Sequence, residues 1–193
     1  GKIIMKYDIL LAGVGEQGVL SIAAVIATAA MKDGLYVRQS EVHGMSQRGG
    51  GVQAHLRLSD KPISSDLIPS GKADMILSME PLESLRYLQW LSVDGVLITD
   101  AKPFENIPNY PEVEKLYDAI KVLPKAKIVE AEELAKKAGN SKAENMVLVG
   151  AALEYIPVKK ETIIQSVKDR FASKDPKLVE INCTAIDLGS EVK

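Results

Sequence analysis

The stretch YDILLAGVGEQG, residues 7–18, decides the fold of this chain. Its first half is a short apolar run that ends at Gly13, a pattern typical of a buried strand. Its second half matches G-x-G-x-x-G. In this pattern the first glycine, Gly13, permits a tight turn, the second, Gly15, lets another group approach the backbone, and the third, Gly18, lets the helix pack closely on the strand. The uncharged segment at residues 17–31 continues as that helix, which we expect to begin near Glu16. The stretch therefore predicts the strand–turn–helix unit that opens an α/β domain.

Patterns of the same two kinds continue along the chain. Strand patterns cover residues 35–40, 52–58, 73–78, 96–99 and 127–129. Helix patterns cover residues 81–91, 113–122, 132–138, 143–156 and 160–171. The run at 52–58 alternates apolar and polar residues, which predicts a half-exposed strand, and the type of the segment beginning at Pro176 stays open. Strands that alternate with helices predict an α/β fold, here a Rossmann-like three-layer domain with a mostly parallel sheet.

The overall composition bounds the class of protein. The chain has 193 residues, of which 46% are hydrophobic, so we expect one core and a single domain over residues 1–193. Its formal net charge is −2 and no run of Lys or Arg exceeds two residues, which argues against a nucleic-acid partner. The single cysteine, Cys183, cannot form an internal disulfide or supply a four-thiolate cluster or zinc site. We therefore expect Cys183 to be a small core residue and the chain to hold no metal.

The sequence shows neither a membrane-spanning segment nor a signal peptide. The uncharged segment at residues 17–31 is shorter than the roughly 20 residues that a membrane-spanning helix needs. Residues 1–6 are too few and too charged to form a signal peptide. We therefore expect a cytoplasmic protein without a membrane partner.

The first glycine motif admits more than one interpretation. In dinucleotide-binding enzymes an acidic residue follows the motif by about 20 residues and holds the ribose hydroxyls. Here Arg38 stands near that position, and Glu16 places a negative charge where a pyrophosphate would arrive. A purely structural turn, contact with a partner chain and binding of another phosphate ligand at the helix N-terminus all stay open.

The second glycine motif, SEVHGMSQRGGG at residues 40–51, is the most informative stretch. Its glycines make the backbone permissive, and several directional polar side chains are packed among them. A wide turn between two strands would explain the glycines, whereas the polar set favours contact with a ligand or partner. No residue is assigned a catalytic role. The candidate ligand or partner contacts from both motifs are Gly13, Gly15, Gln17, Gly18, Glu41, His43, Gly44, Ser46, Gln47, Arg48, Gly49 and Gly50.

Together the two motifs resemble a known family. A strand–GVGxQG–helix unit followed by S-E-x-H-G-M-x-Q-R-G-G is similar to the gamma-type domain of 2-oxoacid:ferredoxin oxidoreductases. Within that family it most resembles the beta subunits of the enzymes that act on indolepyruvate, because the pyruvate-specific relatives carry an E-R-R-G-type loop here. The similarity extends through residues 56–57, 71–74 and 80–88. The chain departs from the family at Glu16, where glycine is usual, and at Gly51, where serine or threonine is usual.

The resemblance implies a subunit that is inactive alone. The family converts a 2-oxoacid, here indolepyruvate or another aryl pyruvate, and coenzyme A to acyl-CoA, CO2 and reduced ferredoxin. It implies a large alpha subunit that carries thiamine diphosphate and the iron–sulfur clusters, with no cofactor bound by this chain alone. Ferredoxin and coenzyme A would be met through the complex. The alternatives are a free-standing NAD(P)-binding Rossmann oxidoreductase and a binding module without catalysis.

Overall fold

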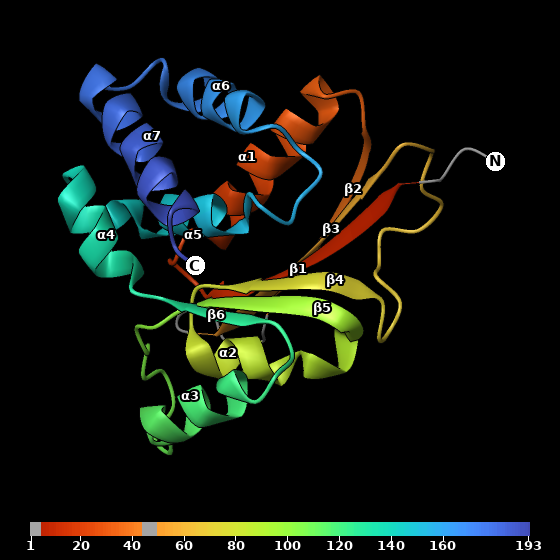
Figure 1. The fold of residues 1–193 in the computed structure, drawn as a ribbon, viewed down its shortest axis with the longest axis vertical. Helices are drawn as coiled ribbons and strands as arrows, with labels where there is room; N and C mark the ends of the chain where they lie inside the picture. The colour runs from red at the N-terminus through yellow and green to blue at the C-terminus, as the bar shows by residue number, and fades with distance from the viewer. Residues whose placement is uncertain (1–4, 44–49) are drawn as a thin grey trace.

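A computed structural model describes residues 5–43 and 50–193, and the structural statements below concern these residues (Figure 1). Their strands form one six-stranded sheet in the order β2-β3-β1-β4-β5-β6. The strands are β1 Lys6–Val14, β2 Tyr36–His43, β3 Gly51–Ser59, β4 Ala73–Ser78, β5 Leu91–Asp100 and β6 Ala126–Val129. β1, β4, β5 and β6 pair in parallel, whereas β3 runs antiparallel to both β1 and β2. The expected α/β fold with a mostly parallel sheet is confirmed.

Helices cover both faces of this sheet, which gives the expected three layers (Figure 1). The helices on one face are α1 Val19–Lys32, α4 Ala131–Ala138, α5 Glu144–Ala152, α6 Lys160–Phe171 and α7 Pro176–Ser190. Those on the other face are α2 Pro81–Arg86 and α3 Val113–Lys121. Two short 3-10 turns, Leu88–Trp90 and Ser141–Ala143, precede β5 and α5. No helix among the described residues has both the length and the apolar character needed to cross a bilayer.

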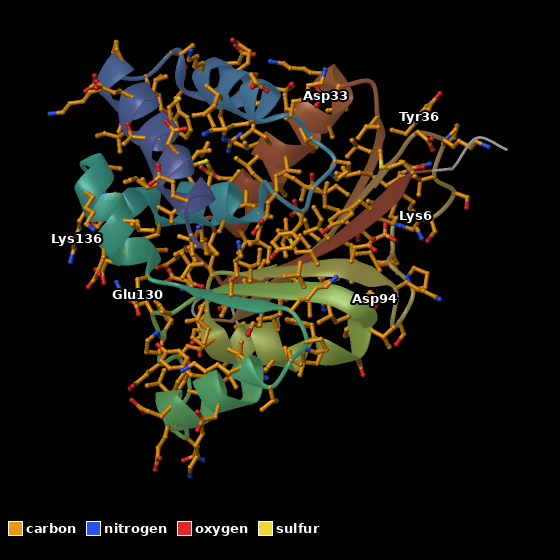
Figure 2. The ribbon with its side chains drawn as sticks, in the orientation of Figure 1. Lys6, Asp33, Tyr36, Asp94, Glu130 and Lys136 are labelled. Carbon is orange, nitrogen blue, oxygen red and sulfur yellow. The ribbon has the colours of Figure 1, made fainter. Side chains whose placement is uncertain are left out.

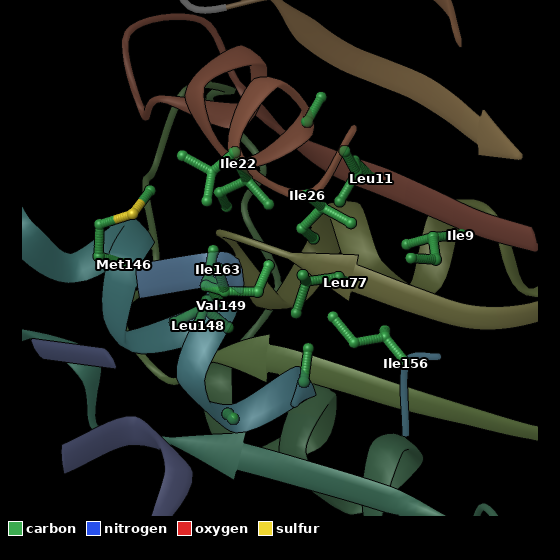
Figure 3. Packing of buried hydrophobic residues seen from close by; sticks show 14 of the residues in the cluster. Ile9, Leu11, Ile22, Ile26, Leu77, Met146, Leu148, Val149, Ile156 and Ile163 are labelled. Carbon is green, nitrogen blue, oxygen red and sulfur yellow. The ribbon is translucent and has the colours of Figure 1, made fainter. Parts of the chain in front are cut away.

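The central strand β1 supplies side chains to a core on each face of the sheet. Ile9 and Leu11 belong to the larger cluster under α1 and α5, while Leu10 and Ala12 belong to the smaller one on the opposite face. Figure 3 shows the larger cluster, in which Leu11 lies beside Ile26 of α1. Residues 9–12 are fully buried, as expected for a strand covered on both faces.

The uncharged helix is covered mainly by its own domain. Eight residues of α1 are buried, and the helix packs on α5, α6 and β3. Leu20 and Met31 are the large apolar side chains of α1 that stay exposed. Cys183 was expected within the core. It is only partly buried and packs against the margin of the core.

The start of α1 was expected near Glu16, and this expectation is wrong. Glu16 and Gly18 both have a φ of 82°, a left-handed conformation that cannot belong to a right-handed helical turn. Residues 15–18 therefore form a turn, and the helix begins at Val19. β1 ends at Val14, one residue beyond the expected end.

Two further boundaries differ from the expectations, and the segment that was left open now has a type. The helix expected over residues 81–91 ends at Arg86, because Tyr87 leaves the helical conformation and Leu91 already begins β5. β2 extends to His43, so the first three residues of the loop expected at residues 41–51 belong to the strand. The segment from Pro176, left open by the sequence, is helix α7.

Strand β3 is not half-exposed as expected. From Ala54 to Ser59 every side chain is buried, including those of His55 and Arg57. The apolar residues face α1, and the polar ones are covered by the loop between β3 and β4. A polar residue in an alternating strand thus need not face water when a loop supplies its hydrogen bonds.

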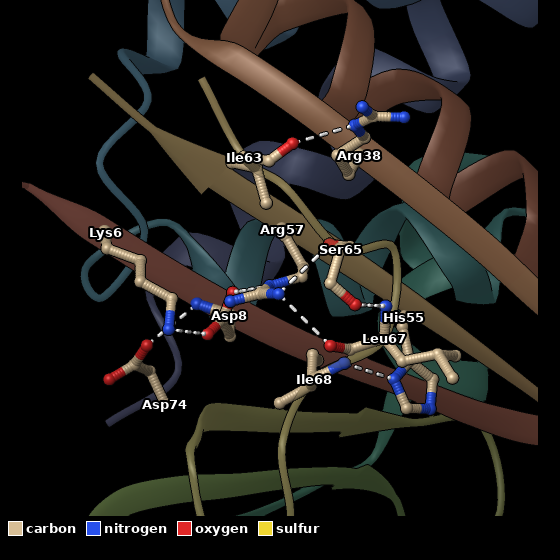
Figure 4. A network of polar contacts seen from close by, with 10 residues as sticks. All are labelled: Lys6, Asp8, Arg38, His55, Arg57, Ile63, Ser65, Leu67, Ile68 and Asp74. Carbon is tan, nitrogen blue, oxygen red and sulfur yellow. Dashed lines mark hydrogen bonds and ion pairs between the residues drawn. The ribbon is translucent and has the colours of Figure 1, made fainter. Parts of the chain in front are cut away.

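Figure 4 shows how that loop is held. Arg57 Nε donates to Asp8 Oδ1 at 2.9 Å, and Arg57 Nη1 donates to the carbonyl oxygens of Ser65 and Leu67. His55 Nδ1 accepts from the backbone N–H of Ile68 at 3.0 Å. The buried ion pair of Asp8 and Arg57 therefore joins β1, β3 and the loop into one unit.

Candidate functional site

The candidate site lies at the carboxyl ends of the parallel strands. In Figure 2 this end is marked by Glu130, directly after β6, and the opposite end by Asp94 near the start of β5. A pocket of about 430 Å³ opens there. The first glycine loop, the segment after β5 and the first turn of α5 line it. Ligands of open α/β sheets bind in crevices at this edge, so the pocket is where the fold predicts a site.

A second hollow adjoins the first. It has a volume of about 340 Å³ and is mainly apolar, with Val14, Leu20 and Val52 in its wall. Leu20 is 40% exposed. Glu16 and Gly18 line both hollows, so the first glycine loop forms the ridge between them.

The glycines of this loop have different roles from those expected. Gly13 was expected to permit the tight turn, yet it is Gly18 that has a positive φ. Gly18 was expected to allow close packing of helix on strand, yet a Cβ on Gly13 would lie 2.7 Å from Val19 Cγ2. The close helix–strand contact is therefore made at Gly13, because the helix begins later than the motif suggests.

Gln17 braces the loop from within. Its Oε1 accepts from the backbone N–H of Val14 at 2.7 Å, and its Nε2 donates to the carbonyl oxygen of Met79 at 3.2 Å. The side chain thus joins the ends of β1 and β4 while lining the larger pocket. Both polar atoms of the Gln17 amide therefore have partners within the chain. That Gln17 contacts a ligand or partner stays a prediction.

The structure brings the two glycine motifs together at Gly15 and Gly50, whose backbones are hydrogen bonded. Glu41 and His43 lie at the end of β2, opposite Ala54 and Val52 of β3. Glu41 Oε1 accepts from Gln39 Nε2 at 3.1 Å. The other candidates of the second motif lie outside the described residues, and they are Gly44, Ser46, Gln47, Arg48 and Gly49.

Two carboxyl groups that the sequence did not single out, those of Asp100 and Glu144, line the larger pocket. Asp100, the last residue of β5, is 1% exposed, and its Oδ1 accepts from the backbone N–H of Lys102 at 3.1 Å. Its Oδ2 is buried and no described residue donates to it. Burial, and next the contact with Glu144, raises the pKa of Asp100 to about 8. An acid directly after the apolar strand run was the one signal available in the sequence.

A second acidic group supports the wall of the pocket. Glu80 is buried, and its Oε1 accepts from the backbone N–H of Glu83 at 3.0 Å. Its Oε2 accepts from the backbone N–H of Phe104 at 3.0 Å and from the Tyr110 hydroxyl. Glu80 thereby holds the proline-rich segment that places Phe104 at the pocket.

Comparison with known proteins gives the family. The model of the pyruvate ferredoxin/flavodoxin oxidoreductase family matches residues 8–192. The chain belongs to this family. The resemblance inferred from the two glycine motifs is therefore confirmed.

Two proteins of the same extent support this placement, and a third, longer protein shares the fold. The indolepyruvate oxidoreductase subunit IorB of Pyrococcus horikoshii is 38% identical over 95% of this chain and 94% of that protein. The gamma subunit of a keto/oxoacid ferredoxin oxidoreductase from Geobacter sulfurreducens has a TM-score of 0.71 and 26% identity, covering 96% of each chain. The 2-oxoglutarate:ferredoxin oxidoreductase of Magnetococcus marinus shares the fold at a TM-score of 0.77 and 20% identity, and this chain spans 30% of it.

Proposed function

We propose that this chain is the small subunit of an indolepyruvate:ferredoxin oxidoreductase. The complex would convert indolepyruvate or another aryl pyruvate and coenzyme A to acyl-CoA, CO2 and reduced ferredoxin. The observation that carries this proposal is the 38% identity to the IorB subunit over nearly the whole of both chains. In the proposal residues 1–193 form a single domain of a cytoplasmic enzyme.

The cofactors belong, in this proposal, to a larger partner subunit. One cysteine in the whole chain cannot supply the thiolates of an iron–sulfur cluster. The described residues contain no group of three or more His, Cys, Asp or Glu side chains able to hold a metal ion. The residues therefore do not fit a cluster or the metal of thiamine diphosphate, and no step of the reaction is assigned to this chain.

The proposed contact region is the edge where the two glycine motifs meet. The hydrogen bond between Gly15 and Gly50 joins the described parts of the two motifs, and Gly15 lines the smaller hollow. An exposed apolar residue, Leu20, and an exposed acid, Glu16, flank this edge. We expect it to face the thiamine or coenzyme A region of the partner, with positioning of the partner or ligand as its task.

The experiment is reconstitution with the large subunit. The chain is expressed with and without a large thiamine-binding subunit of this family, and reduction of ferredoxin is measured with indolepyruvate and coenzyme A. Activity should require both chains and should be higher with indolepyruvate than with pyruvate or 2-oxoglutarate. Activity of the chain alone, or failure to form a complex with the partner, would contradict the proposal.

The G-x-G-x-x-G motif alone favours a second candidate, a free-standing NAD(P)-dependent oxidoreductase. Its geometry here is unsuited to that role. The neighbour of β1 on the side of β2 is the antiparallel strand β3, whereas a dinucleotide fold places a parallel strand with its acidic residue there. Arg38 instead contacts the Ile63 carbonyl oxygen and Asp66. Calorimetric titration of the chain with NAD should show no binding, and micromolar affinity would revive this candidate.

A further inference from the structure

The carboxyl group of Asp100 is buried, and burial disfavours its ionised form. It lies at the end of β5, 1% exposed, at the base of the pocket formed with the first turn of α5. One oxygen accepts from the backbone N–H of Lys102, and the other, Oδ2, has no donor among the described residues. The backbone N–H groups of Lys102 and Ala131 favour the ionised form of Asp100, yet burial outweighs them. A proton on the oxygen that lacks a donor removes the cost of burying a charge there.

The neighbour of that oxygen is a second carboxyl group. Glu144, the first residue of α5, has a side chain that is 19% exposed and lines the same pocket as Asp100. After burial, its carboxyl group is the next cause of the raised pKa of Asp100. If both groups were ionised, each would present only acceptors to the other. A proton between them converts this repulsion into a short charge-assisted hydrogen bond.

The surrounding charges do not replace that proton. Lys102 Nζ lies 3.1 Å from Glu132 Oε1 and 3.9 Å from Glu144 Oε1, and its side chain is 52% exposed. It therefore partly balances Glu144, and among the described residues no ion pair joins it to Asp100. Two other titratable groups, Glu16 of the glycine loop and Lys142 of the turn before α5, line the same pocket. The pKa of Tyr117 on α3 is raised by burial and by nearby acids that include Asp100.

We infer that Asp100 and Glu144 form a proton-binding site, in which one shared proton holds the first turn of α5 against the carboxyl end of β5. The site also bears on the first glycine loop, because Asn145 follows Glu144 directly. Asn145 Nδ2 donates to the Gly18 carbonyl oxygen at 3.5 Å. A Cβ atom on Gly18 would lie only 2.6 Å from the same Nδ2, so the two residues are closely packed. Loss of the proton would therefore loosen the wall shared by α5, β5 and the loop. This inference does not depend on the proposed function.

The sign of the pH effect follows from the direction of the shift. Burial and the contact with Glu144 raise the pKa of Asp100 to about 8, above its value in an unfolded chain. Between these two values the folded chain holds one proton more than the unfolded chain. The stability contributed by the site is therefore complete at low pH and is lost as pH rises through neutrality.

The test compares unfolding of the full chain with that of Asp100→Asn, whose amide can donate to Glu144 at every pH. Between pH 5 and 7 the equilibrium constant for unfolding of the wild type, divided by that of the variant, should rise by up to about tenfold per pH unit. Glu144→Gln should remove the same slope. Glu132→Gln, which changes a carboxyl on the other side of Lys102, is the matched control and should keep it.

A direct measurement covers the case in which the variants do not fold. In the wild-type chain the carboxyl carbon resonance of Asp100, followed by 13C NMR, should titrate well above the ordinary range near pH 4. Titration near pH 4, or a constant ratio between wild type and Asp100→Asn, would overturn the inference.

Discussion

The backbone N–H of Gly15 donates a hydrogen bond to the carbonyl oxygen of Gly50, with 3.1 Å between the two atoms. The bond continues the antiparallel ladder of β1 and β3 beyond the pair of Val14 and Gly51. Gly15 was expected to allow close approach of another group, and the group found beside it is the backbone of the second glycine motif. The described parts of the two motifs that carry the family resemblance are thus joined at this bond.

Gly15 and Gly18 should respond differently to alanine. A Cβ on Gly15 would meet nothing nearer than the Gly50 carbonyl oxygen at 4.0 Å, so Gly15→Ala should change stability by less than about 0.5 kcal/mol. Gly18 has a φ of 82°, and its Cβ would lie 2.6 Å from Asn145 Nδ2. Gly18→Ala should therefore cost about 1–2 kcal/mol or more. Urea unfolding of both variants measures the loss of stability. Equal losses for Gly15→Ala and Gly18→Ala would contradict the different roles assigned to the two glycines.

The ion pair of Arg57 and Asp8 should be critical to folding stability. Both side chains are almost completely buried, at 8% and 1% exposure. Arg57→Met should destabilise the chain by about 3 kcal/mol, because the buried Asp8 carboxylate would lose its buried partner and keep only the partly exposed Lys6. Asp8→Leu combined with Arg57→Met should lose less than the single variant. Arg38→Met, at the exposed pair with Asp66, is the control and should cost under about 1 kcal/mol. A double variant as unstable as Arg57→Met would contradict this account.

His55 should remain neutral at physiological pH. Burial, and next the charge of Arg57, lowers the pKa of His55 below its ordinary value, and its Nδ1 accepts from the Ile68 N–H. The unfolded chain therefore takes up a proton first, so this contribution to stability is present above about pH 6.5 and is lost as pH falls. NMR titration of the imidazole should give a pKa below 6.5. The chain has two histidines, so His43→Gln assigns the signal. A His55 pKa above 6.5 would refute the proposed environment.

Arg48→Lys should lower turnover of the assembled complex by about tenfold or more. Arg48 lies outside the described residues, and the reason is chemical: a guanidinium binds a carboxylate or phosphate through two parallel hydrogen bonds that an ammonium cannot reproduce. Unfolding of the variant chain should change by less than about 0.5 kcal/mol. Wild-type turnover in a correctly assembled variant would mean that the second glycine motif is only a turn.

The sequence predicted the candidate site better in position than in detail. The apolar run before Gly13 and the glycine motif located the edge of the sheet where both hollows lie, since local patterns reflect local structure. It did not predict that Gly13, not Gly18, makes the close contact with the helix. That outcome depends on the left-handed turn at Glu16, which no propensity for glutamate would suggest.

The sequence by itself determined the α/β class, the alternation of strands and helices and the family. These follow from the spacing of apolar residues and from short motifs, both of which are properties of neighbouring residues. Only the tertiary structure decided that β3 lies antiparallel between β2 and β1, that Arg57 is buried and that Asp100 meets Glu144. Each of these joins residues distant in the chain, and burial and desolvation arise only once the layers have packed.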